Sequence, residues 1–245
     1  PHSNALVAEG NAVCTQCHKS ETYDAPTHHR HLATSTGSAC VACHMPSQVY
    51  MGVDARRDHS MRIPRPDVSL STGSPNACTQ CHEDQTDSWA YEALQQWGVS
   101  TDFQELSLVK ARFAADRGDV RSLPTLESVV TDDERSPLMR ASLIEQLGNL
   151  GSRQLPSLTA MLLRADAPEL RASAVRATRS MPPAQRYLML RPFISDPVLT
   201  IRMEVAQVLA GVPASELRPQ DIDDLKPLFE EYLAVQANHL DMPSV

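Results

Sequence analysis

The chain has 245 residues, of which 42% are hydrophobic and 21% are charged, a composition typical of soluble globular proteins with one or two domains. Its 30 acidic and 22 basic side chains give a formal net charge of −8, which argues against a nucleic-acid-binding protein. No stretch approaches the roughly 18 apolar residues of a membrane-spanning helix, so we expect no membrane span in this chain. All six cysteines lie within the first 82 residues, which divides the sequence into two unlike halves.

Three copies of a Cys-x-x-Cys-His motif use every cysteine of the chain. The cysteine pairs are Cys14 and Cys17, Cys40 and Cys43, and Cys78 and Cys81, and the histidines that follow them are His18, His44 and His82. Two thiols at this spacing can each form a thioether bond with one vinyl group of a haem, and the adjacent histidine then binds the iron axially. We therefore predict three covalently bound c-type haems.

The same cysteines are compatible with two alternative interpretations, a zinc site and a disulfide framework. A zinc site can be built from two Cys-x-x-Cys pairs, and six cysteines can form a disulfide framework. Neither alternative explains why a histidine follows every second cysteine, and a zinc site built from the first two pairs leaves the third pair without a partner. The haem interpretation is therefore favoured.

Each haem iron needs a sixth ligand, and the histidines outside the motifs are the best candidates. Five of them lie among the first 59 residues, a density that solvated surface histidines do not explain. The predicted distal ligands are His2, His28, His31 and His59. Because His28, His29 and His31 are close in sequence, we expect only one of them to reach any one iron, and His31 is slightly favoured. The weaker candidates are His239, Met45, Met51 and Met61.

Ligation by two histidines has a functional consequence, because a six-coordinate iron has no open position for a substrate. Such haems transfer electrons, and three of them attached between residues 14 and 82 must lie close together. The porphyrins would then form the hydrophobic core of this half, so we expect short helical turns joined by loops. A basic segment near the second motif has two equally favoured interpretations. Its arginines could pair with haem propionates, or the segment could be a loop that faces solvent. Its arginines are Arg56, Arg57, Arg62 and Arg65.

The second half contains a helical repeat of 31 residues. Arg140, Arg171 and Arg202 recur at this interval, and a proline precedes each of them by three to five positions. Apolar stripes at helical spacing follow in the first and third units, and residues 155–162 predict a partner helix between them. The segments resemble short HEAT-type repeats over about residues 102–215. Helices around residues 102–116 and 221–239 would cap the array.

The predicted fold class is therefore mainly α, with two domains. Residues 1–98 would form a compact triheme cytochrome module with little regular structure, and residues 99–245 an α-solenoid of HEAT-like helix pairs. Stacked helix pairs present a broad surface that ordinarily binds another protein, although the array could instead only shield the haem module.

The haem half also resembles a known family well beyond the bare motifs. The matching stretches are GNAVCTQCH, YDAPTHHRH, CVACHMP, DARRDHSMRIPRPD and PNAC. They closely resemble the C-terminal haem region of a family of bacterial multihaem c-type cytochromes, over about residues 1–98. Members of that family often carry tetratricopeptide or HEAT-like repeats after the haems. The resemblance implies that His2 ligates a haem, as its counterpart does.

The leading hypothesis is an exported triheme electron carrier rather than an enzyme. Its partners would be other redox proteins, multihaem cytochromes or copies of itself, and it would reside in the periplasm or outside the cell, because haem is attached covalently there. The rival hypothesis is a reductase of small nitrogen or sulfur oxyanions, with one five-coordinate haem beside Arg56, Arg57 or His29. A third reading treats the haems as structural staples.

Overall fold

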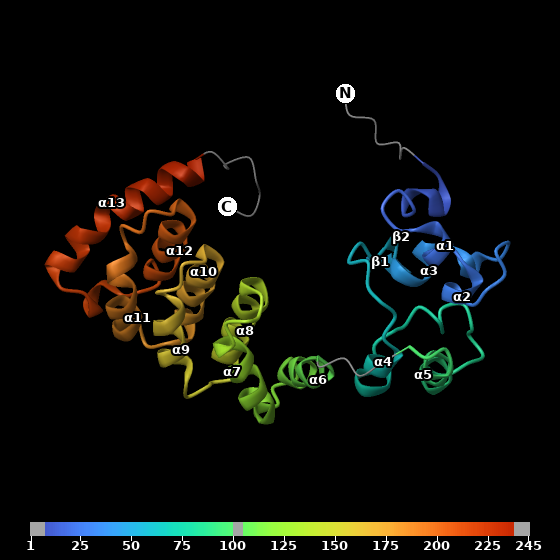
Figure 1. Cartoon of the computed structure of the whole chain (residues 1–245). Helices are drawn as coiled ribbons and strands as arrows, with labels where there is room; N and C mark the ends of the chain where they lie inside the picture. The colour runs from blue at the N-terminus through green and yellow to red at the C-terminus, as the bar shows by residue number, and fades with distance from the viewer. Residues whose placement is uncertain (1–7, 100–104, 238–245) are drawn as a thin grey trace. The chain divides into compact units, whose positions relative to one another are not determined.

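The structure of the chain is a computed structural model that describes residues 8–99 and 105–237. It is mainly α-helical, which confirms the predicted class (Figure 1). The chain divides into two compact units, Pro1–Leu106 and Ser107–Val245. Among the described helices, none combines the length and the apolar character that a membrane crossing requires.

Short elements joined by loops make up the first unit. In chain order they are η1 (Gly10–Val13), α1 (Ser20–Tyr23), α2 (Pro26–His29), η2 (Thr36–Ser38), α3 (Cys40–His44), β1 (Ser47–Tyr50), β2 (Asp54–Arg57), α4 (Pro66–Thr72) and α5 (Asp87–Gln96). Pro26 and Pro66 begin α2 and α4, where a missing N–H group leaves no hydrogen bond unmade.

A β-hairpin that the sequence did not predict follows the second motif. β1 and β2 pair in antiparallel fashion, from Ser47 opposite Arg57 to Tyr50 opposite Asp54. The guanidinium of Arg57 donates hydrogen bonds to the carbonyls of Val41 (3.2 Å) and Met45 (3.1 Å), at the end of α3. The carbonyl of Val41 also accepts from the N–H of Met45, and the two bonds from Arg57 anchor the hairpin to the second motif.

The first unit has almost no apolar core made of protein. Its buried residues between positions 8 and 89 are Ser38, Pro66, Asp67, Ser69 and Asn76. Large apolar side chains are exposed there instead, and Leu32, Met51 and Val53 are 77%, 82% and 83% accessible. Since apolar burial is the main driving force of folding, the described protein atoms alone supply little of it in this unit.

The second unit is built from longer helices. In chain order its elements are α6 (Leu106–Ala115), η3 (Val120–Ser122), α7 (Leu123–Thr131), α8 (Pro137–Asn149), α9 (Leu155–Leu162), α10 (Pro168–Ala177), η4 (Thr178–Ser180), α11 (Pro183–Leu190), η5 (Arg191–Phe193), α12 (Leu199–Leu209), η6 (Ala214–Glu216) and α13 (Pro219–Gln236). α8 packs against α10 and α10 against α12, while α9 contacts α8 and α10 (Figure 1).

The predicted apolar stripes form the core of this unit. Its fully buried side chains include Leu143, Ile144, Leu147, Val205 and Leu209. The predicted partner helix is α9, in which Met161 is largely exposed, contrary to the expected stripe. Of the two predicted caps, α6 begins at Leu106 and α13 at Pro219; residues 102–104 and 238–239 lie outside the described ranges.

The recurring arginines each donate to a backbone carbonyl of the segment that precedes their helix. The guanidinium of Arg140 donates to the carbonyl of Val130 (2.9 Å), that of Arg171 to Ala165 and Asp166 (2.9 Å each), and that of Arg202 to Asp196 (2.7 Å). Each arginine lies in the first part of α8, α10 or α12 and ties that helix to the segment before it. Arg171 and Arg202 bond the carbonyl six positions earlier, whereas Arg140 bonds one ten positions earlier, so the interval of 31 residues marks an arginine–carbonyl contact that recurs with a variable span.

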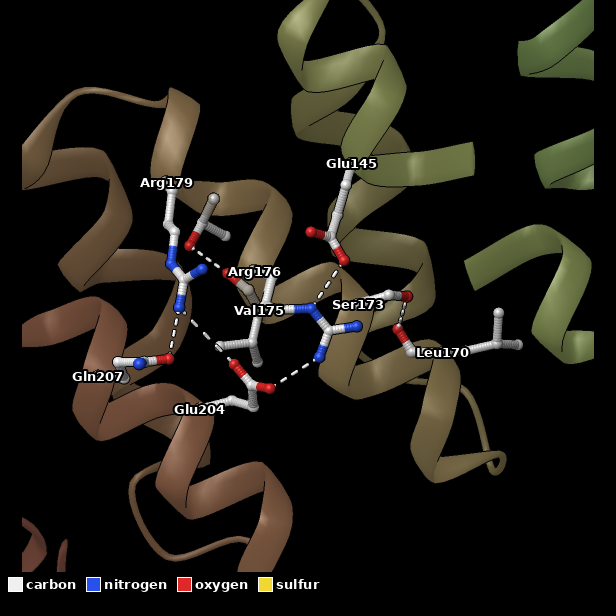
Figure 2. Close-up of polar contacts among 9 residues, drawn as sticks. Glu145, Leu170, Ser173, Val175, Arg176, Arg179, Glu204 and Gln207 are labelled. Carbon is white, nitrogen blue, oxygen red and sulfur yellow. Dashed lines mark hydrogen bonds and ion pairs between the residues drawn. The ribbon is translucent and has the colours of Figure 1, made fainter. Parts of the chain in front are cut away.

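A second set of ion pairs joins successive repeats. Arg176 of α10 donates to Glu145 of α8 (2.7 Å) and to Glu204 of α12 (2.8 Å), as Figure 2 shows. One turn later, Arg179 donates to Gln207 of α12 (2.6 Å). One guanidinium thus ties α10 to both neighbouring helices, α8 and α12.

Asp221, in the first turn of α13, gives this unit a dependence on pH. Arg218 donates to its carboxylate from Nε and Nη2 (2.8 Å each), and these bonds lower the pKa of Asp221. A carboxylate with a lowered pKa stabilises the folded state above its unfolded-state pKa of about 3.9, and this stabilisation is lost as the pH falls toward the folded-state pKa. We expect Asp221→Asn to lower the melting temperature at neutral pH and to lower it less in acid. Thermal unfolding followed by circular dichroism at several pH values tests this; a difference independent of pH would contradict it.

Candidate functional site

Each Cys-x-x-Cys-His motif folds as a single helical turn. The backbone N–H of His18 donates to the carbonyl of Cys14, and that of His82 to Cys78, at 3.0 Å in both turns. The second motif is itself a short helix, α3. Positions i, i+3 and i+4 share one face of a helix, so both thiols and the imidazole of each motif lie on the same face. Attachment and axial ligation of one haem require that arrangement.

Two asparagines that the sequence analysis did not single out hold the motifs in place. Asn11 donates to Asp24 (2.7 Å) and to the carbonyl of Ser38 (3.0 Å), and it accepts from the N–H of Cys40 (2.9 Å). It thus ties the turn before the first motif to the start of the second. Its only signal in the sequence was its place within a stretch that resembles the cytochrome family.

Asn76 has the corresponding role at the third motif. This buried side chain donates to Asp87 of α5 (2.6 Å) and accepts from the N–H groups of Cys78 (3.0 Å) and Thr79 (3.1 Å). We expect Asn76→Ala to destabilise the first unit by about 1–3 kcal/mol, because buried donors lose their acceptor. Thermal unfolding followed by circular dichroism measures this change. Gln80→Ala, at an exposed position of the same motif, is the matched control and should change stability little.

Thiols of successive motifs lie next to one another. The thiols of Cys14 and Cys40 share a hydrogen bond; burial, and then this neighbour, raises the pKa of Cys40. Burial also raises the pKa of Cys43, with a further contribution from Cys81. The second motif therefore adjoins both the first and the third. All six cysteines are free, so the structure contains no bridge of the alternative disulfide framework.

Several imidazoles are oriented in the way that metal-binding histidines usually are. The Nδ1 atom of His31 lies within hydrogen-bonding distance of the backbone carbonyl of His29. In the same way, Nδ1 of His44 lies 2.9 Å from the carbonyl of Arg62, and Nδ1 of His59 lies 2.8 Å from the carbonyl of Arg57. A hydrogen bond from Nδ1–H to a carbonyl fixes the tautomer and leaves Nε2 to bind a metal. Two predicted distal ligands, His31 and His59, and one predicted proximal ligand therefore share this orientation.

Two of the candidate distal histidines lie beside motif histidines. The ring centroids of His28 and His44 are 6.2 Å apart, and those of His31 and His82 are 6.0 Å apart. Burial, and then the neighbouring His44, lowers the pKa of His28, which favours the neutral form that binds a metal. His2 and His239 lie outside the described residues.

Two aromatic residues beside the motif histidines were not predicted from the sequence. The ring of Tyr23 lies 5.5 Å from that of His18 and 5.5 Å from that of His28, and Trp89 lies 4.9 Å from His82. Tyr23 is the first residue of the stretch YDAPTHHRH that resembles the cytochrome family, whereas Trp89 lies outside the matching stretches, and only the folded chain reveals the contacts of either ring. The methionine candidates Met51 and Met61 are exposed.

The basic segment finds partners within the protein. Arg65 forms a short ion pair with the buried Asp67 (2.6 Å), and Arg57 binds α3 as described above. Arg56 and Arg62 form exposed ion pairs with Asp54 (3.3 Å) and Asp58 (3.6 Å). The predicted pairing of these arginines with propionates remains a prediction, and it fits Arg56 and Arg62, whose ion pairs are exposed, better than the half-buried Arg65.

No model of a protein family matches the chain, and no curated protein or solved structure is significantly similar to it. Within residues 8–99 and 105–237, no group of three or more His, Cys, Asp and Glu side chains is arranged to hold a metal ion.

Proposed function

We propose that the chain is an exported electron-transfer protein that carries three c-type haems in its first unit. The observation that supports this most directly is that all six cysteines belong to three turns of the same geometry, each with its histidine on the face of its two thiols. The cysteines would hold the haems through thioether bonds, and His18, His44 and His82 would bind the irons. Bound haem supplies a one-electron Fe(III)/Fe(II) couple.

The exposed apolar side chains of the first unit also fit this cofactor. A unit of about 90 described residues with almost no buried apolar side chain needs another apolar surface on which to pack. Leu32, Met51 and Val53 are available for such packing. Three porphyrins would supply this surface.

Intact mass of the purified protein under denaturing conditions tests the proposal. We expect the polypeptide to keep the mass of three haems and its red colour after extraction with acidified acetone. Cys40→Ala/Cys43→Ala should lower the mass by one haem. Loss of all colour on extraction, or zinc instead of iron in elemental analysis, would contradict the proposal.

A reductase with one five-coordinate haem is the second candidate. The first motif favours this function, because among the described residues the aromatic ring beside His18 is that of Tyr23 and not that of a candidate distal histidine. Electron paramagnetic resonance of the oxidised protein separates the two functions. A carrier with three bis-histidine haems gives low-spin signals throughout, and the His2→Ala or His59→Ala variant should then make one haem high-spin. A full high-spin signal from one haem in the unaltered protein would favour the reductase.

We further propose that the second unit is a HEAT-like array that docks a redox partner or another copy of the chain. The repeated contact of Arg140, Arg171 and Arg202 supports this reading. Stopped-flow electron exchange with soluble c-type cytochromes tests it in the full chain. Charge reversal at the exposed Arg153 and Arg164 beside α9 should slow exchange with a docked partner, whereas an array that only shields the haems predicts an unchanged rate. Sedimentation velocity over a range of concentrations reports self-association.

A further inference from the structure

A residue with a left-handed backbone separates His28 from His31. α2 ends at His29, and Arg30, which caps it, is left-handed (φ 58°, ψ 22°). A residue other than glycine costs roughly 1 kcal/mol or more in this conformation, so the surrounding structure must hold it there. After this residue His31 lies beside His82 of the third motif, whereas His28 lies beside His44 of the second.

The distances between these rings are those of two imidazoles that share one iron. With metal–nitrogen bonds of about 2 Å, the ring centroids of two axial histidines lie roughly 6 Å apart. The observed separations are 6.2 Å for His28 and His44 and 6.0 Å for His31 and His82. One member of each pair follows a cysteine pair, and the other is a histidine outside the motifs.

His29 occupies the same segment but has a different environment. Its ring lies 6.5 Å from that of His31, its Nδ1 accepts a hydrogen bond from the backbone N–H of His31 (3.2 Å), and its carbonyl accepts from the imidazole of His31. Neither His29 nor His31 is the histidine of a Cys-x-x-Cys-His motif, so the ring of His29 faces no proximal ligand in this pair. The carbonyl that accepts from the imidazole of His31 belongs to the backbone and is kept in His29→Ala, so His29 serves as a matched control.

We propose that His28 is the distal ligand of the haem attached to Cys40 and Cys43, and that His31 is the distal ligand of the haem attached to Cys78 and Cys81. This inference rests on the proposed function and assigns a sixth ligand to each of two irons. The proximity of Cys43 to the thiols of the third motif agrees with it, since ligands only three residues apart must serve neighbouring haems. The haem of the first motif is then left to His2 or His59.

Spin state in the full protein tests whether the two histidines serve different irons. We expect His28→Ala and His31→Ala each to convert one haem of three to the high-spin form, and the double variant to convert two. Added imidazole should restore the low-spin form. His29→Ala should leave all three haems low-spin. A double variant with only one high-spin haem would show that both histidines compete for one iron, and would overturn the assignment.

Removing one attachment site at a time tests which iron each histidine serves. In the Cys78→Ala/Cys81→Ala background, His31→Ala should add no high-spin signal, while His28→Ala should add one. In the Cys40→Ala/Cys43→Ala background the outcome should be reversed. The opposite pattern in both backgrounds would exchange the two assignments and refute the proposal. If either background fails to fold, the full-complement single and double variants still decide whether one iron or two is involved.

The failure of this inference is distinguishable from failure of the proposed function. An intact mass with fewer than three haems in the unaltered protein would contradict the function itself. Three haems, all low-spin in both His28→Ala and His31→Ala, would leave the function standing and refute only the ligand assignment.

Discussion

Replacing all six motif cysteines with serine is expected to unfold the first unit and to leave the second unit folded. The reason is the distribution of apolar burial. From residue 8 to residue 89 the buried residues are four polar ones and Pro66, whereas the second unit buries an extensive cluster that runs from Leu108 to Leu228. Under the proposed function the porphyrins supply apolar surface, and without them the short turns of the first unit have too little apolar area to offset the loss of chain entropy.

Limited proteolysis followed by mass spectrometry provides the measurement. In the serine variant we expect early cleavage throughout residues 8–99, while a fragment containing residues 107–237 persists as long as it does in the unaltered protein. The helical circular dichroism should fall only by the part that the first unit contributes. Unaltered protein produced without haem attachment should give the same digest. A first unit that resists protease equally in the serine variant would show that the protein atoms suffice for its fold.

The cysteine spacing and the 31-residue interval were informative because each reflects a local geometric requirement. One helical turn places the thiols and the imidazole of a motif on one face, and this relation between spacing and geometry holds wherever the motif occurs. Likewise, the recurrence of Arg140, Arg171 and Arg202 marks a hydrogen bond made within about ten residues of the arginine. Patterns that arise from short-range contacts can be read from the sequence alone.

Contacts between distant segments were not predictable in this way. The bond between Asn11 and the start of the second motif spans 29 residues, and the bond from His44 to Arg62 spans 18. The left-handed residue between His28 and His31 is Arg30, and not the glycine or asparagine that usually indicates this conformation in a sequence. The sequence therefore identified candidate ligands, while their pairing required the fold.

Arg171→Met is expected to destabilise the second unit strongly. The side chain of Arg171 is 13% accessible and that of its partner Asp196 is 6% accessible, with 3.2 Å between Nε and the carboxylate. Arg171 also donates to the carbonyls of Ala165 and Asp166. Removing the guanidinium leaves a buried carboxylate uncompensated, which costs about 3–5 kcal/mol. For a unit of this size the melting temperature should fall by roughly 10 °C.

Two comparisons show whether the stranded carboxylate causes this loss. Arg121 pairs with Asp119 at 2.7 Å, but its side chain is 88% accessible, so Arg121→Met should cost no more than about 1 kcal/mol. Adding Asp196→Asn to Arg171→Met removes the buried charge and should recover part of the lost stability, which a double-mutant cycle in urea measures. Asp196 also accepts from the N–H of Val198 (2.9 Å), and an asparagine retains an oxygen for that bond. A double variant less stable than Arg171→Met alone would indicate that the carbonyl bonds of Arg171, rather than the ion pair, stabilise the repeat.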